Sequence, residues 1–209
     1  MIEERVIASW KFKKGVLDAK TASLCYLAER LPIHGTGITL SSAQAQMARQ
    51  FIEAAGLSQR VECLEGDFTN LPSTIRPADV AYAIESFVHG PSAQRFFEQS
   101  HRVLKPGAVM RAAIPDASKY IRSYCDPEHD FLNGWRDIAH RGLPPLLGLQ
   151  EEFYGFGHCT IYDYETFAFF CETVGFASVQ ERRFGESAVQ PCPDSEWRIT
   201  DSFYADVVK

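Results

Sequence analysis

The feature that most limits the fold of this chain is a regular alternation of two hydrophobic periods over its first 120 residues. Short apolar runs, typical of buried strands, alternate with longer amphipathic stretches at helical spacing. The expected strands are 15–19, 35–40, 60–64, 79–84 and 108–114, and the expected helices are 21–31, 42–55 and 92–104. Such alternation predicts βαβ units and therefore an α/β fold, a doubly wound and mostly parallel sheet with helices on both faces.

The last third of the chain first interrupts this pattern and then completes it. Residues 124–157 are rich in proline, glycine and aromatic side chains, and we interpret about 124–160 as an insertion or lid facing the substrate. A helix at 164–174 and strands at 177–184 and 201–208 follow it. We therefore predict one domain over all 209 residues. Its seven strands, numbered along the chain, should lie in the order 3-2-1-4-5-7-6, with the seventh antiparallel.

The composition excludes several classes of function. The chain has a net charge of −6 and no block of lysines or arginines, so a nucleic-acid partner is not expected. It has no apolar run long enough for a membrane span and no signal-peptide pattern at its start, which predicts a cytoplasmic protein. The six cysteines lack metal-type spacing, so we expect reduced thiols and no metal site. A homo-oligomer or a partner subunit stays open.

In a doubly wound sheet, ligands bind beyond the carboxyl ends of the strands. The residues that should carry function are therefore those just after each expected strand. These are 18–24, 39–44, 66–68, 84–89 and 114–120.

Five short motifs occur in this region in a characteristic order. They are GITLSSAQ (37–44), GLSQRVE (56–62), GDFTNLP (66–72), AIESFVH (83–89) and RVLKPG (102–107). Their succession over about residues 15–116 resembles the class I S-adenosylmethionine-dependent methyltransferases of small-molecule, sugar and sterol type. The resemblance implies a seven-stranded Rossmann-like methyltransferase fold, S-adenosylmethionine as cofactor and a small natural-product or sugar-type molecule as methyl acceptor.

The resemblance also assigns cofactor-binding residues. Asp67 matches the acid that accepts the adenine amino group, and Phe68 the residue that lines the adenine ring. Gln44 is placed to contact the ribose or the methionine tail, and the structural alternative is an exposed helix glutamine. An ordinary acidic turn is the corresponding alternative for Asp67. The full expected set is Asp18, Thr39, Gln44, Asp67, Phe68 and Glu85.

The sequence departs from the family at its first motif, where a glycine-rich loop normally lets the backbone approach the cofactor closely. In the register that starts at Asp18, the glycines are replaced by Lys20, Ala22 and Leu24. One interpretation is an altered loop that still binds the cofactor. The other is a methyltransferase-fold protein that transfers no methyl group, either a tailoring cyclase or a non-catalytic partner subunit.

For the reacting centre, the preferred general base is His89, because an imidazole titrates near neutral pH. Asp116 is expected to orient this histidine or to bind the acceptor. For His89, the structural alternative is a histidine without a functional role. For Asp116, it is the N-cap of the following helix. In the aromatic insertion, Tyr154 and His158 are the candidates for contacting the acceptor.

Overall fold

Seven strands form one sheet, in the order β3-β2-β1-β4-β5-β7-β6, which confirms the predicted order. The computed structural model describes residues 4–9, 20–84, 88, 90, 92–126, 144–155, 157–194, 196 and 199–209. The strands are β1 (Glu4–Ser9), β2 (Ile33–Thr39), β3 (Val61–Glu65), β4 (Ala78–Ile84), β5 (Leu104–Pro115), β6 (Ser178–Arg182) and β7 (Ser202–Val208). The first five strands pair in parallel, and β7 is antiparallel to both β5 and β6. Because the five parallel strands end at one edge, that edge collects the residues that follow them.

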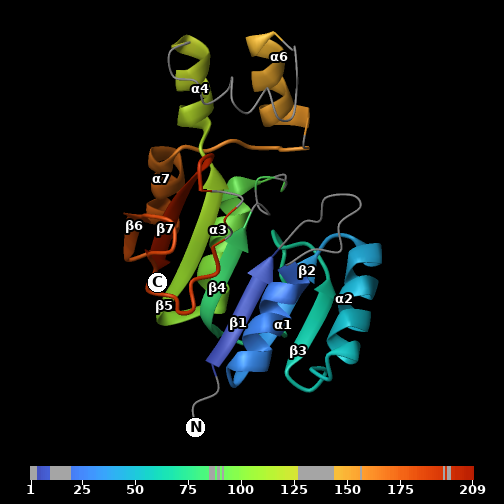
Figure 1. Cartoon of the computed structure of the whole chain (residues 1–209). Helices are drawn as coiled ribbons and strands as arrows, with labels where there is room; N and C mark the ends of the chain where they lie inside the picture. Colours follow the sequence, from blue (N-terminus) through green and yellow to red (C-terminus); the bar gives the residue numbers. More distant parts are fainter. Residues whose placement is uncertain are drawn as a thin grey trace.

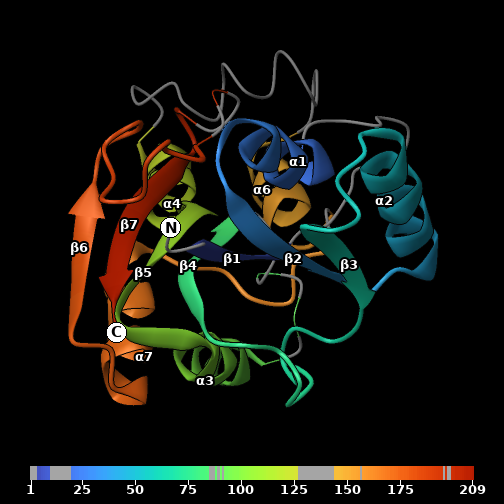
Figure 2. The same ribbon diagram turned by 90° about the horizontal axis from the view of Figure 1, so that it is seen from below.

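Helices cover both faces of the sheet. Figure 2 shows α1 (Lys20–Arg30) and α2 (Ser42–Ala54) on one face and α3 (Ala93–Val103) and α7 (Tyr164–Val174) on the other. A third group lies beyond the carboxyl edge of the parallel strands (Figure 1). It consists of α4 (Ala117–Cys125), α6 (Pro145–Gln150) and the single π-helical turn η2 (Glu151–Gly155). No helix in the described ranges is long and apolar enough to cross a membrane.

The position of the first strand differs from the prediction. We expected residues 15–19 to form it, but Glu4–Ser9 lies between β2 and β4, with Val6 opposite both Gly35 and Val80. Residues 15–19 lie outside the described part of the chain. The apolar run Val6-Ile7-Ala8 is uninterrupted rather than alternating, which is the sequence pattern typical of a central parallel strand. The register that starts at Asp18 was therefore wrong, because Lys20 begins α1 and Leu24 is fully buried within it.

Two apolar clusters fill the spaces between the layers. Under α3 and α7, Phe97 makes edge-to-face contacts with Tyr162 and Phe167 and stacks on Phe170 at 5.8 Å between ring centroids. Under α1 and α2 the cluster is mainly aliphatic. Its members include Leu24, Ala28, Ile33, Ala48, Ile52 and Val61. Both clusters contain residues of the central strands, so the sheet forms one continuous core with helices on its two faces.

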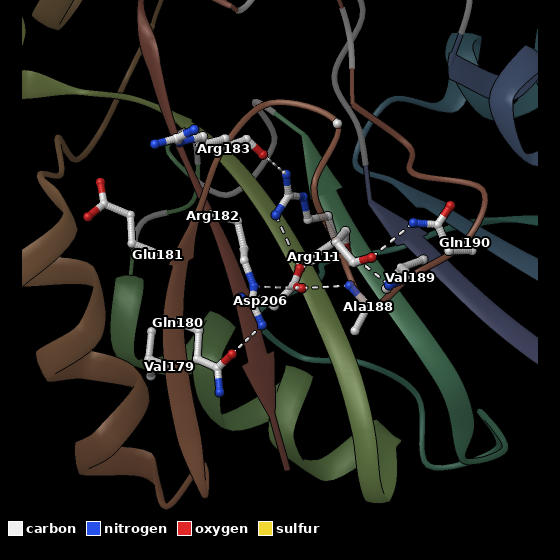
Figure 3. Close-up of polar contacts among 12 residues, drawn as sticks. Arg111, Val179, Gln180, Glu181, Arg182, Arg183, Ala188, Val189, Gln190 and Asp206 are labelled. Atoms are coloured by element: carbon white, nitrogen blue, oxygen red, sulfur yellow. Dashed lines mark hydrogen bonds and ion pairs between the residues drawn. The ribbon is translucent and has the colours of Figure 1, made fainter.

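A buried ion cluster fixes the segment that follows β6. Arg111 of β5 is inaccessible to solvent, and its guanidinium donates to both carboxylate oxygens of Asp194, at 2.9 Å from Nε and 2.6 Å from Nη2. Its Nη1 donates to Asp206 of β7 at 3.1 Å. Arg182 of β6 approaches the same Asp206 from the other side at 3.4 Å (Figure 3). Two cations and two carboxylates thus compensate one another, and they tie residues 183–194 to the sheet.

Candidate functional site at the carboxyl edge of the sheet

Thr39 and Gln44 form a rigid polar pair where β2 ends. The Thr39 side chain is 1% exposed, and its Oγ1 accepts a hydrogen bond from the backbone amide of Ser41 at 3.3 Å. The same hydroxyl donates to Gln44 Oε1 at 2.7 Å. This pairing uses the carbonyl oxygen of Gln44, so its two amide N–H groups point away from Thr39 and can serve a ligand.

Asp67 lies beside this pair, just after β3. The backbone amide of Gly66 donates to the carbonyl of Thr39 at 2.9 Å, which joins the two loops. Asp67 Oδ1 accepts hydrogen bonds from the amide and the hydroxyl of Thr69, both at 2.7 Å. Among the described residues, no hydrogen bond uses Oδ2. The turn therefore holds one carboxylate oxygen in place and leaves the other to accept from a ligand.

Phe68 does not share this position. Its side chain is 6% exposed and packs edge-to-face on Phe96 of α3, with 6.0 Å between the ring centroids. It borders an apolar cavity of about 340 Å³ between the sheet and α3. The ring belongs to the core, and its role in lining an adenine ring stays a prediction.

The strap, which we define as residues 157–163, connects η2 to α7 and crosses the carboxyl edge beneath α4 and α6 (Figure 1). The amides of Cys159 and Thr160 both donate to the carbonyl of Val88, at 2.7 and 3.1 Å. At its far end, the amide of Ala117 donates to the carbonyl of Tyr162 at 2.8 Å, and Tyr162 pairs with Asp116. The strap is thereby fixed both to the segment after β4 and to the end of β5.

A small cavity lies between the strap, α4 and η2. Most of its wall is apolar, with a few convergent polar side chains, as is usual for a small-molecule site. It is lined by Val88, Pro115, Ala117, Tyr120, Glu152, Phe153, His158, Thr160 and Ile161. Glu152 was not among the expected site residues, and it is only 3% exposed. Nothing in the run Gln-Glu-Glu-Phe indicates which of its two glutamates faces inward.

The structure brings some of the expected site residues together and separates others. His158 lines the cavity, whereas the Tyr154 side chain is 73% exposed and does not. Asp116 caps α4, with Oδ1 accepting from the amide and the hydroxyl of Ser118 at 3.0 and 2.7 Å, as its structural alternative predicts. The three other expected residues lie outside the described part of the chain. They are Asp18, Glu85 and His89.

Electrostatic effects near the strap are local. Burial raises the pKa of the Tyr162 phenol to about 12, so this residue is neutral at physiological pH. The pKa of Asp163 is lowered because its carboxylate accepts hydrogen bonds from Thr166 at the start of α7. Across the described residues, no three histidine, cysteine or acidic side chains gather into a metal-binding group.

Comparison with known proteins shows a likeness to methyltransferases. Residues 20–107 match the family model described as a methyltransferase domain. A sterol 24-C-methyltransferase of Gibberella zeae, ERG6B, is 37% identical over 76 residues. That match covers 36% of this chain and only 20% of the relative, so the chain matches about a fifth of the curated enzyme's length.

Solved structures extend the likeness over nearly the whole chain. An S-adenosylmethionine-dependent methyltransferase from Aquifex aeolicus superposes with a TM-score of 0.59 at 14% identity, covering 98% of this chain and 81% of that one. The [4+2]-cyclase SpnF superposes with a TM-score of 0.61 at 18% identity, covering 99% and 73%. At such identities the likeness shows the fold alone.

Proposed function

We propose that the chain is a class I S-adenosylmethionine-dependent methyltransferase and that it methylates a small molecule of natural-product or sugar type. The observation that carries the proposal is the joined pair of loops after β2 and β3. There Thr39, Gln44 and Asp67 present fixed polar atoms next to one another at the carboxyl edge. This is the edge at which doubly wound sheets bind nucleotides.

The residues at this edge fit the chemistry of the cofactor. Asp67 Oδ2 can accept from the adenine amino group, and the Gln44 amide can donate to a ribose hydroxyl or to the methionine carboxylate. We extend the site, on the family resemblance, to Glu85. When bound, S-adenosylmethionine supplies an electrophilic methyl carbon on a sulfonium sulfur.

For the reacting centre, we propose His89 as the general base. It would take the proton from the acceptor atom that receives the methyl group. His89 follows Val88, which lines the cavity and whose carbonyl holds the strap. We propose Asp116 as a positioning residue, because its Oδ1 caps α4 whereas none of the hydrogen bonds between described residues uses its Oδ2.

The alternative without methyl transfer keeps a sequence basis in changed form, because residues 10–19, which connect β1 to α1, include a single glycine, Gly15. This alternative first depended on the replacement of the glycine motif by Lys20, Ala22 and Leu24. These residues lie in α1, and the connection from β1 to α1 is residues 10–19, outside the described part. The likeness to a cyclase shows a shared fold and adds no support for cyclisation.

Calorimetric titration with S-adenosylmethionine and S-adenosylhomocysteine tests the proposal. We expect binding by the wild type and a loss of about 5- to 150-fold in affinity for Asp67→Ala, corresponding to about 1–3 kcal/mol for an unsatisfied buried donor. Asp79→Ala is the matched control, because Asp79 pairs with Lys105 at the start of β4 and β5, away from the carboxyl edge. No heat from the wild type with millimolar cofactor would overturn the proposal.

A further inference from the structure

We propose that Tyr164 keeps the sheet from pairing edge to edge with a second copy of this chain. β6 is the last strand in the described order, so only one of its sides has a neighbouring strand. The open backbone groups of such an edge strand are a template for pairing with another chain. The Tyr164 hydroxyl occupies two of these groups on β6. The inference does not depend on the proposed function.

The contacts of Tyr164 lie on the open side of β6. Its hydroxyl donates to the carbonyl of Val179 at 3.2 Å and accepts from the amide of Glu181 at 3.1 Å. Between these two residues, Gln180 lies opposite Asp206 of the antiparallel neighbour β7. Residues of an antiparallel strand alternate between those bonded to the neighbour and those that are not, so Val179 and Glu181 face the open side. One hydroxyl thus satisfies a donor and an acceptor that an added strand would use.

Two features hold the Tyr164 ring in place. Tyr164 begins α7, and its N-cap residue Asp163 accepts a hydrogen bond from the amide of Thr166 at 2.8 Å. The ring also packs edge-to-face on Phe203 of β7, with 6.1 Å between the ring centroids. Because the helix and the strand already fix the ring, little further conformational entropy is lost when its hydroxyl bonds to the edge.

The opposite edge of the sheet is covered in a comparable way. β3 is the terminal strand there, and Arg49 of α2 donates from Nε to the carbonyl of Cys63 at 3.0 Å. The amide of Val61, two residues earlier, donates to the carbonyl of Leu57 at 2.9 Å. Loss of the Tyr164 hydroxyl therefore uncovers the β6 edge alone, and we expect the resulting contact to join β6 to β6 of a second copy.

The sequence of β6 suits pairing with itself. In an antiparallel pair of two β6 strands centred on Gln180, Glu181 lies opposite Val179 of the other copy. Arg182 likewise lies opposite Ser178 of the other copy. No two like charges face each other in this arrangement, so the side chains do not oppose it.

Tyr164→Phe tests the inference, because it removes the hydroxyl and keeps the ring that packs on Phe203. Sedimentation of the full chain is measured as the protein concentration is raised from micromolar to millimolar. We expect the variant to form dimers at concentrations at which the wild type does not. Tyr26→Phe is the control, because it removes the hydroxyl of an exposed tyrosine on α1. Equal association of the wild type and Tyr164→Phe at every concentration would overturn the inference.

Amide hydrogen exchange, measured by NMR at micromolar concentration, reports on the edge itself. The Glu181 amide should exchange about fivefold faster in Tyr164→Phe than in the wild type, because it has lost its hydrogen-bond acceptor. The Val61 amide, on the opposite edge, should exchange at the same rate in both proteins, which separates a local change from general destabilisation. An unchanged rate at Glu181 would show that the hydroxyl does not protect this edge and would overturn the inference.

Gln180→Cys tests where the two copies meet. Residues directly opposite each other in an antiparallel pair have Cα atoms about 4.5–5.5 Å apart, which is within the reach of a disulfide. Oxidation should cross-link the double variant of Gln180→Cys with Tyr164→Phe far more than either single variant. Association of Tyr164→Phe without this cross-link would place the contact elsewhere and would also overturn the inference.

Discussion

Leu24 occupies the space directly above the α-carbon of Gly35. The Leu24 side chain is fully buried in α1, and a Cβ atom placed on Gly35 would lie 2.5 Å from its Cδ1 and 2.7 Å from its Cγ. Such distances are shorter than van der Waals contact, so α1 can approach β2 this closely only because residue 35 has no side chain.

Gly35→Ala is therefore expected to destabilise the protein by about 1–3 kcal/mol, the usual cost of overpacking a core. The measurement is the free energy of unfolding in urea. Gly66→Ala is the control, because a Cβ there meets no atom within 4 Å and its φ lies outside the left-handed region. An equal loss in both variants would contradict the role assigned to the Leu24 contact.

The buried ion cluster gives a second prediction. Asp194→Ala removes the carboxylate that is bidentate to Arg111, whose side chain is inaccessible to solvent. We expect a loss of about 3 kcal/mol in the free energy of unfolding, because a buried cation loses its nearest partner. Asp79→Ala breaks a pair of similar length on the surface, with Lys105 41% exposed, and should cost about 1 kcal/mol or less.

A double variant, Arg111→Met with Asp194→Leu, sharpens this test. It removes the Arg111 cation together with the Asp194 carboxylate. Its loss in free energy of unfolding should therefore be smaller than the sum of the losses in Arg111→Met and Asp194→Leu alone. Strict additivity would show that the two side chains do not depend on each other.

Thr39→Val tests how the cofactor edge is held. Valine keeps the shape of threonine but cannot donate to Gln44, so the glutamine amide loses its fixed orientation. We expect the affinity for S-adenosylhomocysteine to fall about fivefold, for a hydrogen bond worth about 1 kcal/mol. Thr36→Val is the control on the same strand, since it removes only an exposed bond to Glu62, and an equal effect there would contradict the prediction.

Asp116 and Asp163 are both N-cap residues, and they allow the structural role of Asp116 to be separated from a functional one. Replacement of either by alanine should cost about 1 kcal/mol of stability, whereas asparagine preserves the cap. If Asp116 positions the reacting groups, Asp116→Asn should slow methyl transfer about tenfold, which is about 1.4 kcal/mol in the barrier, without a change in stability. Asp163→Asn should leave the rate unchanged. A normal rate in Asp116→Asn would show that capping is its whole role.

Two buried thiols predict a loss of stability in alkali. Burial raises the pKa of both Cys25 and Cys63 to about 11. A thiol in the unfolded chain ionises near pH 8.5, so between about 8.5 and 11 the folded state holds protons that the unfolded state has released. The free energy of unfolding should therefore fall as the pH rises through this window.

Urea unfolding at pH 7.5, 9 and 10 under reducing conditions measures that slope. Cys63→Ala should flatten it, although the small cavity lowers stability at every pH. Cys125 is exposed, and Cys125→Ser should keep the wild-type slope. Identical slopes in wild type and Cys63→Ala would contradict the assignment.

The success and failure of the sequence-based predictions have distinct physical causes. Helix α7 was predicted with its exact bounds because Asp163 and Gly175 mark its two ends locally. The first strand was misplaced because the apolar run 15–19 was taken for it, and Leu24 was in consequence read as a replaced glycine. The glycine on which Leu24 packs is Gly35, on the neighbouring strand. Where a helix packs closely on a strand, the sequence does not show which large side chain makes the contact, so Leu24 could not be paired with Gly35 in advance.

Contacts between distant residues could not be predicted at all. Arg111 and Asp194 are 83 positions apart, and neither lies in a motif. The inward turn of Glu152 depends on a π-helical turn, which has no periodicity that a hydrophobic pattern would reveal. By contrast, the loops after β2 and β3 were located correctly, because each directly follows a strand with clear patterning.

The pairing of Asp116 with Tyr162 has a consequence for how this protein can change. The chain leaves the sheet at Asp116 and returns to the same point at Tyr162, so the excursion between them closes like a loop on a fixed base. Lengthening such a closed loop costs little free energy and leaves the strand order untouched. The described parts of this excursion, residues 117–126, 144–155 and 157–161, can therefore change in sequence and length, in evolution or by redesign, while the loops of β2 and β3 stay as they are.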